Sequence, residues 1–312
     1  MTGKNDVTIL GAGSIGLSFA AVFADAGFSV TVCDPDAPRR AQAGEGLAVQ
    51  RDAIALAGLR RGLPGQVTFA ADGDETLPQT TLVIECGPEN LSVKQAIFAG
   101  LLAQCPADAI LVTASSAIPM SQILPDPQDQ RRCLVAHPVN PPAVLRMIEL
   151  CPAPATDASA TDRAAEIFAA AGFAPVRLGH EIEGFVLNRL QGAVLREAYR
   201  LVDEGVTDVA GIEAVMRLGL GPRWALSGPF ETAELNTPGG IRAHAARMGP
   251  AYGRMGAWRG ETVDWHAGLI DTVEAQRRAE IAADQLPARA AWRARAVARL
   301  VAARDVLMGE RP

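Results

Sequence analysis

Short apolar runs, many of them β-branched, alternate with alanine-rich stretches through the first part of the chain. The apolar runs predict strands at residues 7–10, 29–33, 67–69, 82–85, 110–114, 134–136 and 174–178. Helical stretches lie between them, for example at residues 15–26, 93–103 and 162–171. Strands that are apolar at nearly every position are typical of a parallel sheet covered on both faces. This part of the chain therefore predicts an α/β domain with a doubly wound parallel sheet.

From residue 182 onward the strand signal disappears. Residues 185–203 have the spacing of a long amphipathic helix, and further helices follow through residue 306. Helix-ending glycines and prolines occur at Gly205 and within 219–222 and 238–240. We therefore predict two domains, an α/β domain over residues 1–181 and an all-helical domain over residues 182–312.

Composition and charge narrow the classes of partner. The chain has 312 residues, of which 49% are hydrophobic, so it can bury a large core. Its net charge of −6 argues against nucleic acid or an acidic membrane as a partner. An arginine-rich stretch at 289–304 has helical spacing and predicts a solvated helix face or a subunit contact. No apolar run reaches the roughly 18 residues of a membrane span. The first predicted strand begins so early that it leaves no room for the apolar region of a signal peptide, and we therefore expect a cytoplasmic protein.

The cysteines do not suggest a disulfide framework or a metal centre. They stand apart in the sequence, at Cys33, Cys86, Cys105, Cys133 and Cys151. None forms a C-x-x-C pair, and their number is odd. We expect reduced thiols in the core and no bound metal.

A glycine-rich turn follows the first predicted strand. Its residues are Gly11, Ala12, Gly13, Ser14, Ile15 and Gly16, which match G-x-G-x-x-G between a strand and a helix. The glycines permit a tight turn, close approach to a pyrophosphate and close helix–strand packing, and the helix N-terminus offers amides to phosphate. Asp34 ends the second strand at the distance where an acid binds the adenosine ribose and repels a 2′-phosphate. The sequence thus predicts a Rossmann-type domain that binds NAD, although Arg39 and Arg40 leave some tolerance for NADP open.

A histidine at the end of a predicted strand is the candidate catalytic base. His137 follows the run 134–136, and ligands bind at the carboxyl ends of strands in such sheets. Glu149 comes twelve residues later in an apolar run. Alcohol oxidation needs a base for the hydroxyl proton, and a carboxylate can orient and stabilise the imidazole. A histidine before a proline is also compatible with a structural role.

These motifs give the chain a family resemblance. It resembles the 3-hydroxyacyl-CoA dehydrogenase superfamily, and within it the λ-crystallin and L-gulonate 3-dehydrogenase branch. The blocks that carry the resemblance span nearly the whole chain, at residues 11–16, 85–90, 113–116, 136–142, 184–190, 219–224 and 228–232.

The resemblance implies a role for several residues. His137 matches the general base, and Glu149 matches the acid paired with it. Ser116 and Asn188 match residues that hydrogen-bond the reacting oxygen of the substrate. The positions that match cofactor contacts are Asp34, Glu89 and Lys94. From spacing alone, Glu89 and Lys94 are also compatible with an ordinary surface pair at the start of a helix.

The chain departs from acyl-CoA dehydrogenases of this superfamily between its second and third strands. Those enzymes carry a long lysine-rich helical pair there that helps hold CoA. The matching segment of this chain, residues 35–66, is shorter and contains no lysine. Arg223 is instead a candidate partner for a free carboxylate, because a guanidinium can bind one through two hydrogen bonds. A surface or dimer-contact role for Arg223 stays open.

The motifs predict an NAD-dependent dehydrogenase, and the resemblance implies that it oxidises the 3-hydroxyl of a small, L-gulonate-like 3-hydroxy acid to the 3-keto acid. Two alternatives stay open: a dehydrogenase of short-chain 3-hydroxyacyl-CoA or L-carnitine type, and a crystallin-like structural protein that binds NADH. The resemblance also implies a homodimer.

Overall fold

A computed structural model of the chain describes residues 6–62, 65–226, 228–238, 240–259, 268, 275, 278–279 and 282–309. Its contacts divide the chain into two compact units. The first unit comprises Met1–Arg189 and Arg293–Ala302, and the second comprises Leu190–Trp292 and Ala303–Pro312. The boundary that the sequence suggests at residue 181 stays a prediction.

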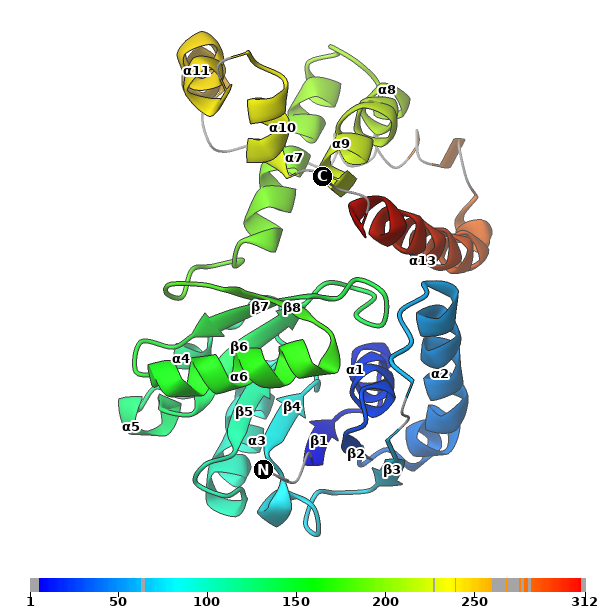
Figure 1. Ribbon diagram of the computed structural model, residues 1–312, viewed down its shortest axis with the longest axis vertical. Helices are drawn as coiled ribbons and strands as arrows, with labels where there is room; N and C mark the ends of the chain where they lie inside the picture. The colour runs from blue at the N-terminus through cyan, green and yellow to red at the C-terminus, as the bar shows by residue number, and fades with distance from the viewer. Residues whose placement is uncertain are drawn as a thin grey trace. The chain divides into compact units, whose positions relative to one another are not determined.

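An eight-stranded sheet forms the centre of the first unit (Figure 1). Its order is β3-β2-β1-β4-β5-β6-β7-β8. The strands are β1 (Asp6–Leu10), β2 (Ser29–Cys33), β3 (Val67–Ala70), β4 (Leu82–Glu85), β5 (Ile110–Thr113), β6 (Cys133–Pro138), β7 (Met147–Pro152) and β8 (Ala174–Arg177). The order reverses between β1 and β4, which is where open α/β sheets place their ligands. The predicted Rossmann-type fold is confirmed.

One strand differs from the prediction of a parallel sheet. β7 runs antiparallel to β6 and is not among the strands that the sequence predicts. An antiparallel neighbour needs only a short connection, so no intervening helix announces β7 in the sequence. The pairing places His137 directly opposite Glu149.

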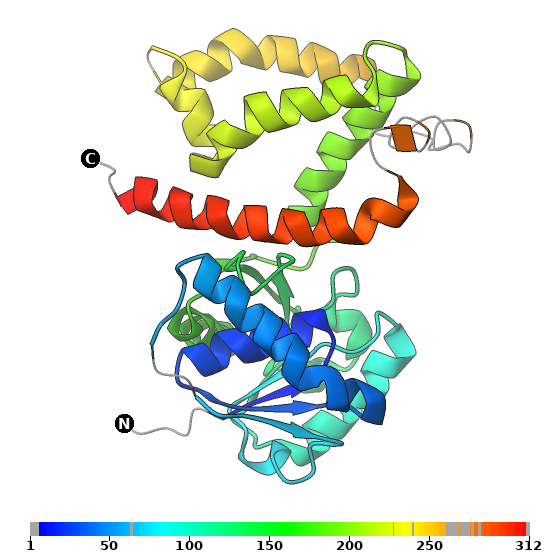
Figure 2. The same ribbon diagram turned by 90° about the vertical axis from the view of Figure 1, so that its right-hand side faces the viewer.

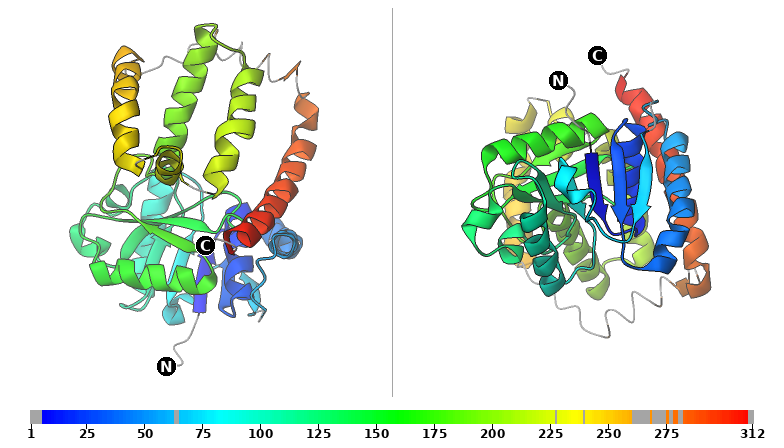
Figure 3. Two further views of the ribbon diagram at one scale, coloured as in Figure 1. Left: turned by 45° about the horizontal axis from the view of Figure 1, so that its top comes forward. Right: turned by 90° about the horizontal axis from the view of Figure 1, so that it is seen from below.

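Helices cover both faces of the sheet (Figure 3). Helices α1 (Ser14–Asp25), α2 (Ala37–Leu56) and α6 (Ala158–Ala171) pack on one face, where Phe19, Phe23 and Phe168 form the aromatic centre of the core. Figure 2 shows α1 and α2 beside each other. Helix α3 (Leu91–Gln104) follows β4, and helices α4 (Met120–Ile123) and α5 (Pro127–Gln130) follow β5. Residues of α3 and α4 contribute to a second core cluster.

The described residues of the second unit form helices and the turns between them, with no strand among them. Its elements are α7 (Leu187–Asp203, which begins in the first unit), α8 (Val209–Ala214), a π-helix (Val215–Leu220), α9 (Gly221–Leu226), α10 (Pro229–Leu235), α11 (Gly240–Arg259), a 3-10 turn (Ala283–Gln285) and α13 (Leu286–Gly309). Ala298 and Val301 of α13 belong to the core of the first unit. Among the described residues, no helix is both long and apolar enough to cross a membrane.

Candidate active site

The glycine turn after β1 is as tight as its sequence predicts. Gly11 has φ +109°, and a Cβ built there would lie 2.8 Å from the carbonyl oxygen of Cys86. A Cβ on Gly16 would overlap the carbonyl oxygen of Gly11. A Cβ on Gly13 would meet no atom within 4 Å. Gly11 and Gly16 are therefore required by the fold, whereas the space beside Gly13 is open.

The start of α1 offers hydrogen-bond donors beside this turn. The N-cap of α1 is Gly13, so no side chain caps the helix, and the first turn holds no acidic residue. The amides of Ser14 and Ile15 precede the first intrahelical bond, from the Leu17 amide to the Gly13 carbonyl. Backbone amides and the positive end of the helix dipole favour an anion such as a pyrophosphate here.

A cavity of about 740 Å³ opens along the same turn, a volume in the range of cofactor sites. It is lined by Leu10, Gly11, Gly13, Cys33, Asp34, Pro35, Asp36, Arg39, Ala71, Asp72, Gly73, Cys86, Gly87, Pro88, Val93 and Ile97. The lining combines apolar walls, glycines and carboxylates. These residues fit a dinucleotide with a free ribose 2′-hydroxyl.

Asp34 is locked into the cavity wall. Its Oδ2 accepts the amide of Ala12 at 2.8 Å, and its Oδ1 accepts the amide of Asp36 at 2.9 Å. Burial alone would raise the pKa of this carboxyl, but the two amides and the guanidinium of Arg39 outweigh burial and hold the pKa below its usual range. Asp34 is therefore a fixed negative charge at the end of β2.

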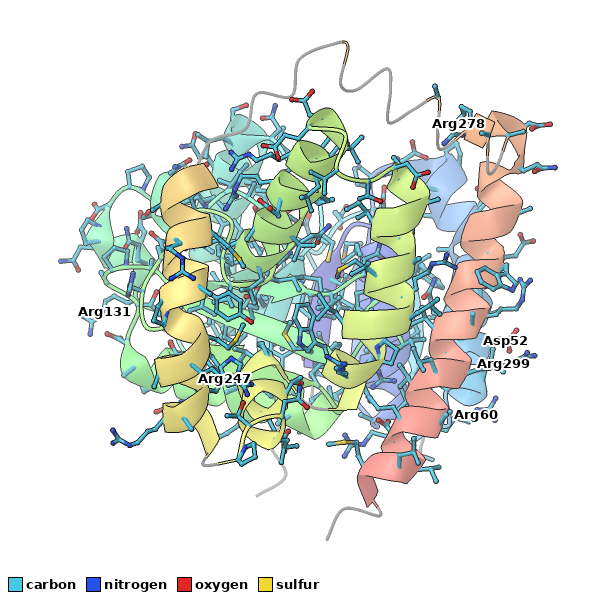
Figure 4. The ribbon with its side chains drawn as sticks, turned by 90° about the horizontal axis from the view of Figure 1, so that it is seen from above. Asp52, Arg60, Arg131, Arg247, Arg278 and Arg299 are labelled. Carbon is cyan, nitrogen blue, oxygen red and sulfur yellow. The ribbon has the colours of Figure 1, made fainter. Side chains whose placement is uncertain are left out.

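Exchanging Asp34 for serine is expected to lower the preference for NAD over NADP about 10-fold to 100-fold. The change removes the charge that repels a 2′-phosphate and releases Arg39, whose guanidinium lies 3.4 Å from the Asp34 carboxylate. The ratio of kcat/KM for the two cofactors measures the effect. Asp52→Ser is the matched control, because Asp52 lies on α2 (Figure 4) and is not among the residues that line the cavity. An unchanged ratio in Asp34→Ser would rule out this role.

His137 and Glu149 form a buried pair across β6 and β7. The Nδ1 of His137 lies 2.7 Å from the Oε2 of Glu149, and both residues are less than 5% exposed. The two side chains come this close because β6 and β7 run antiparallel and His137 pairs directly with Glu149. The structure thus brings together the two residues that the sequence proposes as base and orienting acid.

The second oxygen of Glu149 is held by the turn that leads into α7. Its Oε1 accepts the amides of Val186 and Leu187, each at 2.9 Å. Phe185 reaches this arrangement with φ +49°, a left-handed conformation that is costly for a residue with a bulky side chain. Its ring also lies 5.3 Å from the imidazole of His137, centroid to centroid. Phe185 thus fixes both the amides and the imidazole, a function that sequence inspection did not assign to it.

Glu149 is expected to make stability depend on pH. Burial alone would raise its carboxyl pKa, but the bonds from His137, Leu187 and Val186 outweigh burial and lower the pKa. A lowered folded-state pKa stabilises the protein fully above the unfolded value, near 4.5, and that stabilisation disappears as pH falls through the folded-state pKa. The difference in free energy of unfolding between wild type and Glu149→Gln should therefore shrink from pH ~7 to pH ~3. Urea titrations measure it, and a constant difference would contradict the assignment.

Ser116 and Asn188 also lie together. The Nδ2 of Asn188, on the first turn of α7, donates to the carbonyl oxygen of Ser116 at 2.9 Å. Ser116 lies after β5, and its side chain is exposed. Both positions are in the first unit, as are His137 and Glu149.

Lys94 is not part of a surface pair. It is 1% exposed, and its Nζ lies 2.8 Å from Glu85 Oε2 and 3.5 Å from Glu89 Oε2. Glu85 is fully buried and also accepts the hydroxyl of Thr113 at 2.6 Å. The surface-pair alternative is wrong, because α3 turns Lys94 inward onto the end of β4. Glu85 is not among the residues that the sequence predicts for the site; a charged residue at the end of a buried strand is the signal that points to it.

Arg223 lies in the second unit. It lines a cavity of about 580 Å³ together with Trp224, Phe230, His244 and Tyr252, among others. The Oγ1 of Thr237 is within hydrogen-bond distance of His244 and accepts from Arg247. Arg247 lies on α11 (Figure 4). The walls are largely aromatic and apolar.

Comparison with known families identifies the chain. The NAD-binding domain model of 3-hydroxyacyl-CoA dehydrogenase matches residues 6–182, and the C-terminal domain model of the same enzyme matches residues 184–278. The chain belongs to the 3-hydroxyacyl-CoA dehydrogenase family. As a member of this family it is an NAD-dependent oxidoreductase that acts on a CH–OH group.

Several members of the family resemble this chain along most of its length. A lambda-crystallin homolog of Bos taurus is 36% identical over 295 residues, which cover 92% of each chain. An L-carnitine dehydrogenase of Streptomyces griseus is 33% identical, over 96% of this chain and 86% of its own length. The solved structure of 5-formyl-3-hydroxy-2-methylpyridine 4-carboxylic acid 5-dehydrogenase, an NAD+-dependent dismutase, aligns with a TM-score of 0.85 at 25% identity, over 98% of this chain and 99% of that one.

The five cysteines of this family member are free thiols. Burial raises the pKa of Cys33 and Cys105 to about 11, and that of Cys133 and Cys151 to about 12. It also raises the pKa of Cys86. Thiols of this kind remain protonated near neutral pH and make poor nucleophiles.

Proposed function

We propose that the enzyme oxidises the 3-hydroxyl of a small free 3-hydroxy acid, similar to L-gulonate, to the 3-keto acid. The observation that carries the proposal is the buried 2.7 Å contact between His137 and Glu149 at the carboxyl end of β6. Strand ends on this edge of an open α/β sheet are where ligands bind. When bound, NAD supplies the ring that accepts a hydride.

His137 is the proposed base. Its Nδ1 faces a carboxylate, which favours the tautomer that carries the proton on Nδ1 and leaves the Nε2 lone pair for the substrate hydroxyl. Glu149 stabilises the imidazolium that forms as the proton is taken. Because both oxygens of Glu149 are occupied, the carboxylate cannot rotate away.

Ser116 and Asn188 are the proposed hydrogen-bond donors to the reacting oxygen. Their contact through the Ser116 carbonyl keeps the loop after β5 against the start of α7. Donors that are fixed before the substrate arrives stabilise developing charge without a reorganisation cost.

The proposal of a free acid rests on two features. Between β2 and β3 the described residues form one helix, α2, and the sequence of this segment has no lysine that could hold the phosphates of CoA. Arg223 provides a guanidinium that lines a largely apolar cavity, and a guanidinium can bind a carboxylate through two hydrogen bonds. We propose that Arg223 binds the substrate carboxylate.

A substrate panel tests the proposed reaction. Purified protein with NAD is offered L-gulonate, L-carnitine and 3-hydroxybutyryl-CoA, and NADH formation is followed. A free acid is expected to give the highest kcat/KM. Preference for the thioester would instead support the acyl-CoA alternative. NADH binding without turnover of any member of a broad panel of 3-hydroxy acids would support a structural, crystallin-like protein.

A second experiment tests Arg223. Arg223→Ala should raise KM for the preferred acid roughly 10-fold to 100-fold, because a charged hydrogen-bonded pair is worth about 1.5–3 kcal/mol. It should leave KM for the methyl ester of that acid nearly unchanged. Arg217→Ala, an exposed position outside that cavity lining, is the control. An unchanged KM for the acid would remove Arg223 from the proposal.

A further inference from the structure

We propose that Glu85 is a positioning residue for the cofactor cavity. Glu85 is fully buried at the end of β4 and is not among the residues that line the cavity, whereas the next three residues, Cys86, Gly87 and Pro88, all line it. We call these three residues the β4 turn. The role concerns NAD binding, so it does not depend on which acid the enzyme oxidises.

The buried carboxylate of Glu85 is fully hydrogen-bonded. Its Oε1 accepts the amide of Gly87 at 2.6 Å and the ammonium of Lys94 at 3.1 Å, and its Oε2 accepts Lys94 at 2.8 Å and the hydroxyl of Thr113 at 2.6 Å. An apolar side chain often stabilises a core as well as a buried ion pair does, and the other residues of β4, Leu82–Ile84, are apolar. A buried charge at this position therefore indicates a role besides filling the core.

The bond to Gly87 holds the β4 turn against the glycine turn of residues 11–16. A Cβ on Gly11 would lie only 2.8 Å from the carbonyl oxygen of Cys86, so the two turns are in close contact. On the other side, a Cβ on Gly87 would lie 2.8 Å from the Oε1 of Glu85. The β4 turn is thus enclosed between the carboxylate and the glycine turn. Loss of the Gly87 bond would free this wall of the cavity to shift.

The bonds to Lys94 extend the support to Glu89. The Lys94 ammonium also lies 3.5 Å from the Oε2 of Glu89, and the side chain of Glu89 is 43% exposed. Glu89 and Lys94 match cofactor contacts of the family, and the exposed carboxylate of Glu89 is accessible to a ligand. Glu85 thus fixes the ammonium that lies beside that carboxylate. Without Glu85, Lys94 would keep only Glu89 as an acidic partner among the described residues.

Glutamine at position 85 cannot reproduce these bonds. A carboxylate accepts hydrogen bonds on both oxygens, whereas an amide has one acceptor oxygen and an NH2 group that donates. If the amide oxygen faces Gly87, the NH2 group faces the ammonium of Lys94, which also only donates. Glu85→Gln keeps the volume of the side chain and therefore tests the charge and the bonds without opening a cavity in the core.

Glu85→Gln is the first test. The Kd for NADH, from fluorescence titration, should rise about 10-fold to 100-fold, which is the range expected when a charged hydrogen-bonded group is lost. KM for NAD should rise in parallel, whereas kcat at saturating NAD and acid should fall less than about 3-fold. Amide hydrogen exchange at Gly87 should accelerate, because its acceptor is weakened.

Gly87→Ala disturbs the same contact from the β4 turn and keeps the buried ion pair of Glu85 and Lys94. Its Cβ would lie 2.8 Å from the Oε1 of Glu85, so either the turn or the carboxylate must move. The Kd for NADH should rise at least about 5-fold. This variant decides the question if Glu85→Gln does not fold.

Two controls separate positioning from a general loss of stability. Leu101→Ala truncates a buried residue of α3 that does not line the cavity, and such a truncation destabilises a protein about as much as a broken buried ion pair. Thr113→Val removes one bond of Glu85 and leaves those from Gly87 and Lys94. Titrated well below the Tm of each variant, both should bind NADH within about 3-fold of the wild type.

Two results would overturn the inference. One is a folded Glu85→Gln or Gly87→Ala protein that binds NADH as the wild type does. The other is an equal rise of the Kd for NADH in Leu101→Ala or Thr113→Val, which would mean that any weakening of this part of the core has the same effect. Neither result bears on the proposed reaction, because the substrate panel tests that reaction separately with the wild-type protein.

Discussion

His137→Gln is expected to lower kcat roughly 1,000-fold while NADH binds as in the wild type, a loss in the range of general-base contributions. Glutamine occupies a similar volume and can still hydrogen-bond Glu149, but it cannot take a proton from the substrate hydroxyl. His137 is 4% exposed within the core of the sheet, so a substitution of similar size limits the loss of stability.

Three measurements distinguish this outcome from misfolding. The Tm and the Kd for NADH report the fold and the cofactor cavity, and steady-state kinetics report the chemistry. His180→Gln is the matched control, because the side chain of His180 is exposed. A His137→Gln enzyme with more than about one-tenth of wild-type kcat would show that another group accepts the proton.

The sequence was sufficient for the main architecture because its signals are local. Each parallel strand is an apolar run, and the G-x-G-x-x-G turn lies between a strand and a helix. Local signals cover only half of the candidate dyad. His137 ends a recognisable strand, whereas its pairing with Glu149 rests on the resemblance and on the chemistry of base and acid.

Contacts between distant segments could not be predicted from the sequence. Whether the 147–152 run pairs antiparallel with β6 depends on the loop before it, and a register shift of one residue would point Glu149 to the opposite face. The burial of Lys94 depends on how α3 packs against β4 and β5. Phe185 has no sequence signal for its left-handed conformation beyond the preceding glycine.

The glycine turn gives the second large effect. Gly16→Ala is expected to destabilise the first unit by about 3 kcal/mol or more, because its Cβ would overlap the Gly11 carbonyl and little space is available for relaxation. That overlap involves backbone, which cannot move away as a flexible side chain could. Little folded protein should remain for cofactor binding near physiological temperature. Urea unfolding and NADH titration measure the two losses.

Gly13→Ala is the matched variant that separates fold from binding. Its Cβ would meet no protein atom within 4 Å, so the free energy of unfolding should change by less than about 1 kcal/mol. The same methyl would occupy the space in which a pyrophosphate approaches the backbone at the start of α1, and the Kd for NADH should rise at least 10-fold. If Gly13→Ala bound NADH as the wild type does, the cofactor phosphates would have to lie elsewhere along the cavity. A stable Gly16→Ala would show instead that the turn can relax, and that the close packing of β1 against α1 is not what requires glycine there.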